Sequence, residues 1–415
     1  MYKNKLSLLL FALLTFVQLS TSQNNTNSPY TRFGYGDLSD SYSGERRALG
    51  GTSIGVRSNT GINSVNPASY SAVDSMTFMF DIGVSALGSR FADQSKNSNS
   101  TFNSNLEYIS MQFPITKWLG FSAGAQPYSF VGYNFTTRDS IKSTTNEYIP
   151  YSMNFVGAGG FSQVYSGLSV NLFNHISIGA NGYYMYGMVN NSRGVNFDNT
   201  TDYTSSSLLS SLKASNFRYR VGAQIYNTFA AKHDLTLGFI YEQKAKLNAE
   251  YNELRYGVLF TESTSGYEFE TPTIFGLGLN YAFDKKLSLA FDYSLQQWNE
   301  TKFYSVTDTL QNRSKINVGG EYIPNPKGRK LAERMRYRLG FNLSDSYFNI
   351  NENDKPAKNF GISFGFGIPL RNSKTIINTS FEYGKVSTSN LLNEDFFKIT
   401  FNAAFNEYWF FKRKL

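Results

Sequence analysis

Long stretches of alternating apolar and polar residues recur from residue 76 onward, and this periodicity constrains the fold more than any other feature of the chain. In the stretch Leu287–Leu295, leucine, phenylalanine and tyrosine alternate with serine, alanine and aspartate. Successive side chains of a β-strand point to opposite faces, so the pattern predicts a strand with one apolar face and one wet face. The stretches Phe275–Tyr281, Phe360–Ile368 and Phe397–Phe405 follow the same rule.

Fourteen such stretches can be counted, separated alternately by short turns and by longer polar links. Bacterial single-chain barrels need an even number of strands, with short turns in the periplasm and long loops outside. Short turns are expected near Pro114, Phe173, Ala230, Asp284 and Arg371, and longer links at 92–104, 138–147, 191–214, 302–313 and 349–358; one short-side link, Asn325–Glu333, is longer than its peers. The predicted strands cover residues 76–91, 105–113, 118–137, 148–172, 175–190, 215–228, 233–260, 267–282, 286–301, 314–324, 334–348, 359–369, 374–386 and 395–407.

A chain with this pattern can cross a membrane only as a closed sheet. Beyond residue 20 no run approaches the roughly 18 consecutive apolar residues that a spanning helix needs. Lipid offers the backbone no hydrogen bonds, so the remaining solution is a barrel in which every strand is paired. Aromatic residues make up 16% of the chain, yet the mean hydropathy is −0.34, which suits strands with one apolar face and one wet face.

A secreted β-sandwich or propeller would also contain alternating strands. Here, however, the strands are long and their apolar face is aromatic from end to end. The opposite face carries four arginines that we expect to point into the lumen: Arg218, Arg220, Arg336 and Arg338. The sequence therefore predicts an all-β fold, a transmembrane antiparallel β-barrel of about 14 strands in the outer membrane of a Gram-negative bacterium.

The first 22 residues are typical of an export signal. Lys3 and Lys5 precede an apolar run at Leu6–Val17, and small polar residues follow up to Ser22. A basic start, an apolar core of about a dozen residues and a small-residue cleavage region define a signal peptide. A membrane anchor would need a longer run and a stop-transfer flank. We expect cleavage near Ser22 and divide the chain into a signal peptide (1–22), a segment before the barrel (23–75) and the barrel (76–415).

Composition also bounds the chemistry. The net charge is +8, but Lys and Arg are dispersed along the chain, which indicates loop, turn and lumen residues rather than a nucleic-acid surface. The chain has no cysteine, which excludes disulfides, thiolate metal sites and a lipidated N-terminal cysteine. The two histidines, His175 and His233, open strands beside short turns and have no clustered partners. We therefore expect no enzyme activity, no cofactor and no metal site.

Residues 30–75 do not alternate and are rich in glycine, which suits irregular and tightly turning backbone. The pair Gly50 and Gly51 lies in this segment, and the tripeptide Asn66, Pro67 and Ala68 follows it. A residue before proline is restricted to extended backbone, and the proline itself can begin a short helical turn. The tripeptide therefore fixes a sharp path, although by itself it is a common turn.

Joined to the glycine-rich run, this tripeptide resembles the N-terminal hatch of the FadL/TodX family of outer-membrane transporters for fatty acids and hydrocarbons. The family also has fourteen strands, so the resemblance covers the architecture of nearly the whole chain, while its motifs lie within residues 46–75. It implies that residues 23–75 plug the lumen as a hatch beneath an apolar substrate site. The aromatic end Phe405–Phe411 fits the last strand of such a barrel, whereas the basic tail Lys412–Leu415 departs from an aromatic final residue.

The third predicted strand contains Gly124 and is interrupted by Pro127, and a proline in a sheet belongs at an edge, a bulge or a kink. In the FadL/TodX family a kink in the third strand opens a side window through which substrate leaves into the bilayer. The alternative is a bulge near the rim of the barrel.

Three functions remain open at this stage. The first is passive uptake of a hydrophobic small molecule with lateral exit through the barrel wall. The second, from a PorV-like branch of the same family, is an accessory barrel that binds secreted or cell-surface proteins of a secretion system. The third is a porin for polar solutes. In each case we expect outer-membrane lipid around the barrel and no nucleic-acid partner.

Overall fold

The computed structural model describes residues 25–92, 98–142, 146–197, 203–348, 357–370, 374–387 and 392–408. The predicted signal peptide and the basic C-terminal tail lie outside these residues. The short helical elements are η1 (Pro29–Arg32), α2 (Gly44–Arg47), η2 (Pro67–Ala72) and α3 (Leu331–Arg334). The strands are β1 (Asp37–Leu38), β2 (Thr77–Ala92), β3 (Ser98–Pro114), β4 (Leu119–Lys142), β5 (Tyr148–Leu172), β6 (Ile176–Phe197), β7 (Ser206–Phe229), β8 (His233–Glu242), β9 (Ala245–Lys246), β10 (Asn248–Tyr256), β11 (Thr261–Ser265), β12 (Glu270–Thr271), β13 (Thr273–Phe283), β14 (Leu287–Gln297), β15 (Arg313–Tyr322), β16 (Arg336–Asp345), β17 (Lys358–Pro369), β18 (Ile376–Ser387) and β19 (Asn393–Tyr408).

The predicted fourteen-strand antiparallel barrel is confirmed. Each wall strand pairs with its neighbour in the chain, and β19 pairs with β2 to close the sheet. The seventh wall strand consists of β8, β9 and β10, and the eighth consists of β11, β12 and β13. The β19–β2 pairing removes the two outer edges that an open sheet would expose to lipid.

The two faces of the wall follow the alternation in the sequence. On β14, Leu289, Phe291 and Tyr293 are exposed, whereas Ala290 and Asp292 are buried. The exposed apolar residues form the surface that contacts lipid, and the buried ones face the lumen. Among the described residues, no helix is both long enough and apolar enough to span a membrane.

Several strand boundaries differ from the prediction. The seventh and eighth strands were predicted to be continuous over 233–260 and 267–282, but both are broken. The lower part of the wall is formed by β8, which pairs with β7 and β13. Beyond it, β10 continues along β7, whereas β11 pairs with β10 alone among the described strands, so the β10–β11 hairpin extends the sheet above β13. The predicted link 191–214 is largely strand as well, since β6 runs to Phe197 and β7 begins at Ser206.

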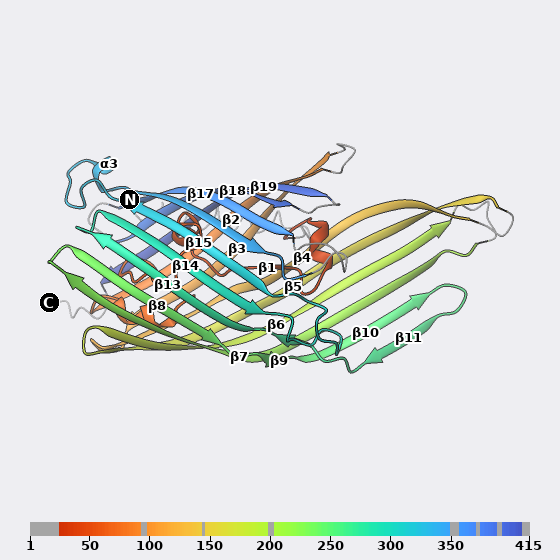
Figure 1. Ribbon diagram of the computed structural model, residues 1–415, viewed down its shortest axis with the longest axis horizontal. Helices are drawn as coiled ribbons and strands as arrows, with labels where there is room; N and C mark the ends of the chain where they lie inside the picture. Colours follow the sequence, from red (N-terminus) through yellow and green to blue (C-terminus); the bar gives the residue numbers. More distant parts are fainter. Residues whose placement is uncertain are drawn as a thin grey trace, which may run out of the picture.

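Four consecutive strands form an extension of the wall. Strands β4 to β7 have 22 to 25 residues each, whereas β13 to β16 have 10 or 11. A tilted spanning strand needs only about 9–11 residues. In Figure 1 the long strands and the β10–β11 hairpin run well beyond the ends of β13 to β16. The extension is at the end opposite the short turns, which is the extracellular side of a bacterial barrel. We refer to it below as the extracellular wall.

Candidate functional site

The N-terminal segment (residues 25–75) packs inside the barrel and makes contacts around its inner face. Tyr35, Thr52 and Tyr70 have 0% exposure. Glycines of the wall allow the segment to approach closely: a Cβ on Gly340 would lie 1.9 Å from the backbone nitrogen of Gly50, and a Cβ on Gly238 would lie 2.0 Å from a carbonyl oxygen of the segment. Larger residues on this inner face would therefore exclude the segment.

The tripeptide at 66–68 joins the segment to four neighbouring strands. The side chain of Asn66 accepts a hydrogen bond from the backbone N–H of Ala68 at 3.1 Å and so caps η2, in which Pro67 is the first residue. The Asn66 amide also donates to the carbonyl oxygen of Ile54 at 2.8 Å and to carbonyl oxygens of β7 and β8. The carbonyl oxygen of Ala68 accepts hydrogen bonds from hydroxyl groups of β5 and β6, at 2.8 and 2.6 Å.

Gly50 and Gly51 form a turn with positive φ angles of 66° and 89°. A Cβ on Gly50 would lie 2.5 Å from the carbonyl oxygen of Phe341 in β16, and a Cβ on Gly51 would meet the ring of Tyr42. Both the backbone conformation and the close packing require glycine here. The pair therefore shapes the segment against the wall.

A carboxylate of the wall accepts hydrogen bonds from the backbone of the N-terminal segment. Asp292 of β14 accepts hydrogen bonds from the backbone N–H groups of Ser53 at 2.5 Å, Ile54 at 2.8 Å and Gly55 at 3.5 Å. The aspartate is 2% exposed. Asp292 was not among the predicted site residues, because its only signal in the sequence is an acidic side chain on the inner face of an alternating strand.

The four arginines predicted to face the lumen lie in two clusters. Arg218 and Arg220 both contact Glu242, at 2.5 and 2.8 Å, and the glutamate is 0% exposed. Arg336 and Arg338 both contact Glu321, at 3.6 and 2.7 Å. The structure thus pairs each couple of arginines with one glutamate on the neighbouring strand, and neither glutamate was among the predicted site residues.

Gly124 and Pro127 lie where two wall strands separate. Strand β3 pairs with β4 over only six residue pairs, from Pro114↔Gly120 to Ile109↔Ala125. On the other side, β4 stays paired with β5, with a register shift between Pro127 and Ser129. A bulge of this kind bends a strand and increases its twist. Beyond Ala125 the wall therefore has a gap between β3 and β4.

The N-terminal segment occupies this gap. Asp37 and Leu38 of β1 pair antiparallel with Phe130 and Ser129 of β4, and the Ser39 N–H donates to β4 at 2.9 Å. On the other side, two asparagines of β3 bond to Asn25 and Asn27 at 2.9 and 3.0 Å. The segment thus bonds to both strands that border the gap and lies between them.

An engineered disulfide tests this pairing, because the chain has no cysteine of its own. We expect Leu38→Cys combined with Ser129→Cys to form a disulfide upon mild oxidation, since directly opposed antiparallel residues lie within disulfide range. Non-reducing electrophoresis should show a faster band. The pair Leu38→Cys and Ser122→Cys is the control and should stay reduced. Equal oxidation of both pairs would contradict the described register.

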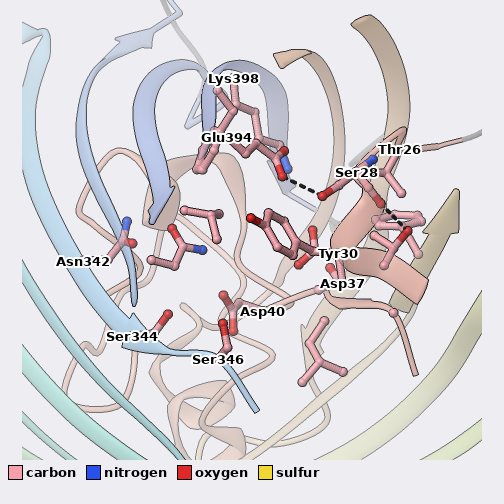
Figure 2. Close-up of a pocket in the computed structure, with 18 of the residues that line it drawn as sticks. Thr26, Ser28, Tyr30, Asp37, Asp40, Asn342, Ser344, Ser346, Glu394 and Lys398 are labelled. Carbon is pink, nitrogen blue, oxygen red and sulfur yellow. Dashed lines mark hydrogen bonds between the residues drawn. The ribbon is translucent and has the colours of Figure 1, made fainter. Parts of the chain in front are cut away.

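A cavity of about 180 Å³ remains between the segment and the inner face of the wall, where β15 to β19 and β2 to β4 contribute to its lining. Figure 2 shows Asp37, Asp40 and Tyr30 of the segment with Glu394 and Lys398 of β19 around this space. A smaller cavity of about 80 Å³ shares Asp40 with it. The lining is mainly polar and charged, which differs from the apolar site that the family resemblance implied.

The cations of the larger cavity are already paired. Asp40 accepts hydrogen bonds from Arg313 at 3.1 Å and from Lys315. Burial alone would raise the pKa of Asp40, but the positive charges of these two residues outweigh it and hold the pKa well below its usual range. Arg47 and Lys398 likewise share Glu107, at 2.5 and 2.7 Å.

The histidines show no catalytic or metal-binding arrangement. His233 is within 2.7 Å of the Tyr281 hydroxyl, and His175 is exposed beside a turn. Within the described ranges, no group of three or more His, Cys, Asp and Glu side chains is arranged to hold a metal ion.

The chain is a closed fourteen-strand barrel with its own N-terminal segment packed in the lumen and a wall gap at the third strand, and it shares its fold with FadL-like outer-membrane barrels. Solved structures with this fold include a FadL homologue from Pseudomonas aeruginosa (13% identity, TM-score 0.57, covering 89% of this chain and 98% of that one). The toluene transporter TbuX from Ralstonia pickettii gives 13% identity and a TM-score of 0.57, covering 88% of this chain and 98% of that one. The toluene transporter TodX from Pseudomonas putida has 13% identity and a TM-score of 0.57, and the match covers 89% of this chain and 98% of that one.

Identity this low shows the fold alone. No curated protein matches the chain. The BamG family model matches residues 1–415, and the chain belongs to the BamG family.

Proposed function

We propose that this protein is an accessory barrel of the outer membrane that holds a protein partner on its extracellular wall. The observation that carries the proposal is the wall itself. Strands β4 to β7 continue for about a dozen residues beyond the length that crosses a bilayer, which at about 3.3 Å per residue adds about 40 Å. Conduction of a small solute requires no such wall, whereas the wall offers a protein partner an extended surface.

The closed lumen supports the same function. The N-terminal segment fills the barrel and also lies in the gap between β3 and β4. Pockets for hydrophobic ligands usually have about 300–1,000 Å³ and are lined mostly by apolar side chains. The cavity of about 180 Å³ is smaller and charged. A barrel in this closed state gives a hydrocarbon neither a binding site nor an exit.

The β10–β11 hairpin is the best candidate for the contact. Its tip carries Val258, Leu259 and Phe260, which are 84%, 79% and 60% exposed. Among the described strands, β11 pairs with β10 alone, so one backbone edge of Thr261–Ser265 remains free. Apolar anchors beside a free strand edge are a common combination at protein interfaces.

A photo-crosslinking amino acid at position 259 tests this function in living cells. We expect a discrete protein adduct at this position and none at Phe291, which faces lipid on β14. The double substitution Val258→Ser and Phe260→Ser should weaken the complex by about 30-fold, because exposed apolar anchors at an interface contribute about 2 kcal/mol together. Native electrophoresis of purified outer membranes measures the loss of the complex.

Heat-modifiable migration is the control that the substituted barrel still folds. If position 259 gives adducts with lipid alone, or if the double variant keeps the complex at wild-type strength, the hairpin is not the contact. If in addition no position on β4 to β7 gives a protein adduct, the accessory function itself is wrong.

The second candidate is passive uptake of hydrophobic small molecules in a Gram-negative outer membrane, with lateral exit through the wall. The gap between β3 and β4 favours it, and two of the structurally similar proteins are toluene transporters. In this case the segment at the gap must move to open the exit. The disulfide between positions 38 and 129 separates the two functions: uptake of toluene or a long-chain fatty acid would stop in the oxidised barrel and return on reduction.

A further inference from the structure

The larger cavity has more anionic acceptors than its own cations satisfy. All four cations that line it already form ion pairs with carboxylates. Arg313 and Lys315 both pair with Asp40. Arg47 and Lys398 both pair with Glu107. None of these cations is left to neutralise another acid.

Asp37 is the acid without a partner. Its side chain is exposed, and the surface that it exposes lines the cavity. Within the part of the chain that the structure describes, its carboxylate has neither a hydrogen bond nor an ion pair. Figure 2 shows Asp37 beside the open space, on the same side as Tyr30.

A second acceptor lies nearby. Asn105 of β3 lines the cavity and is 8% exposed; its amide donates to the N-terminal segment, but its side-chain oxygen has no partner. The side-chain oxygen of Asn359 in β17, which also lines the cavity, is unpartnered too. Buried acceptors of this kind are normally satisfied, so the site calls for a ligand that brings hydrogen-bond donors.

The rest of the lining fits the body of such a ligand. Five of the aromatic residues that line the cavity come from the segment, from β4, from the residues after β16 and from β19: Tyr30, Phe130, Tyr347, Phe348 and Phe396. Aromatic faces attract a cationic nitrogen and also pack against short apolar chains. A cavity of 150 Å³ can hold benzene, so about 180 Å³ admits about seven non-hydrogen atoms.

We propose that this cavity binds a compact primary amine in its protonated form, with Asp37 as the anionic anchor and the aromatic rings around its apolar body. The site does not involve the extracellular wall, so a test of amine binding does not depend on whether the proposed accessory function is correct. Asp37 belongs to β1, which fills the wall gap, so an occupied site would also hold β1 in place against β4.

Three probes of the same size and different charge test the site: n-butylamine, n-butanol and butyrate, with the full-length mature barrel in nanodiscs. Titration calorimetry should give a dissociation constant for butylamine at least about tenfold lower than for butanol, the factor that one charge-assisted hydrogen bond supplies. Butyrate should not bind. In Asp37→Asn the preference for the amine should disappear.

Asp395→Asn is the matched control, because Asp395 lies on β19 beside the cavity residue Glu394 but bonds outward to Tyr383. It should keep the tenfold preference. Ser346→Leu, which fills the cavity without a change of charge, should weaken binding of both butylamine and butanol. Equal affinity for amine and alcohol in the wild type would overturn the proposal, and so would an amine preference that survives in Asp37→Asn.

Discussion

Deletion of residues 30–70 is expected to turn a closed barrel into a conducting one. The deleted residues include α2, the Gly50–Gly51 turn and most of η2, which fill the lumen and contact the inner face on many strands. A fourteen-strand barrel has room for more than its own inward side chains, so water and ions should enter once the segment is gone. In planar bilayers the wild type should show no resolvable steps and the deletion should show discrete open-channel steps.

A single substitution tests the same idea in case the deletion variant does not fold. Asp292→Ala keeps the whole segment but removes the acceptor of three backbone hydrogen bonds, so the segment should loosen in place and give brief openings. Heat-modifiable migration shows whether each barrel is closed. A correctly folded deletion variant with wild-type conductance would mean that the segment does not seal the lumen.

Glu242→Gln is expected to lower the free energy of unfolding by about 3–5 kcal/mol, the usual effect of removing one partner from a buried ion pair. Glu242 is 0% exposed and lies between two arginines, and Arg218 is itself 2% exposed. The neutral amide would leave two guanidinium groups without a counter-charge inside the wall. Urea unfolding in lipid vesicles, followed by tryptophan fluorescence, measures the change.

The control for this variant is Glu268→Gln. Glu268 also contacts two cations, Lys246 and Lys302, but it lies near the barrel surface, where water screens its charge. The unfolding midpoint of the Glu268→Gln variant should equal that of the wild type. If the two substitutions have equal effects, the buried cluster contributes no more than a surface pair.

The architecture could be predicted because the membrane imposes it on each strand locally. Alternation at Leu287–Leu295 needs no distant partner to be recognised, and the same is true of fourteen such stretches. The polar, serine-rich and asparagine-rich ends of β6 and β7 were predicted as a link for the same reason. Outside the apolar band a strand can be polar on both faces, and then the sequence has no periodicity to reveal it.

The site could be predicted only in part, because its contacts join residues that are far apart in the chain. The inward arginines follow from alternation, but their partners Glu242 and Glu321 depend on the register between strands. Pro127 indicated either a bulge or a kink, and the structure has a bulge beside a gap that is occupied by residues about ninety positions earlier. No local pattern encodes such a pairing.

The seam between β2 and β19 has a consequence for biogenesis. The N-terminal segment precedes the first strand of the chain, yet it touches strands on every side of the lumen, and the seam joins the first wall strand to the last. A segment with this many inward contacts packs more readily against an open sheet than by threading into a barrel whose seam has already formed. We therefore expect the segment to be inside the curling sheet before the last strand arrives. The final product would then contain, as its core, the part of the mature chain that was exported first.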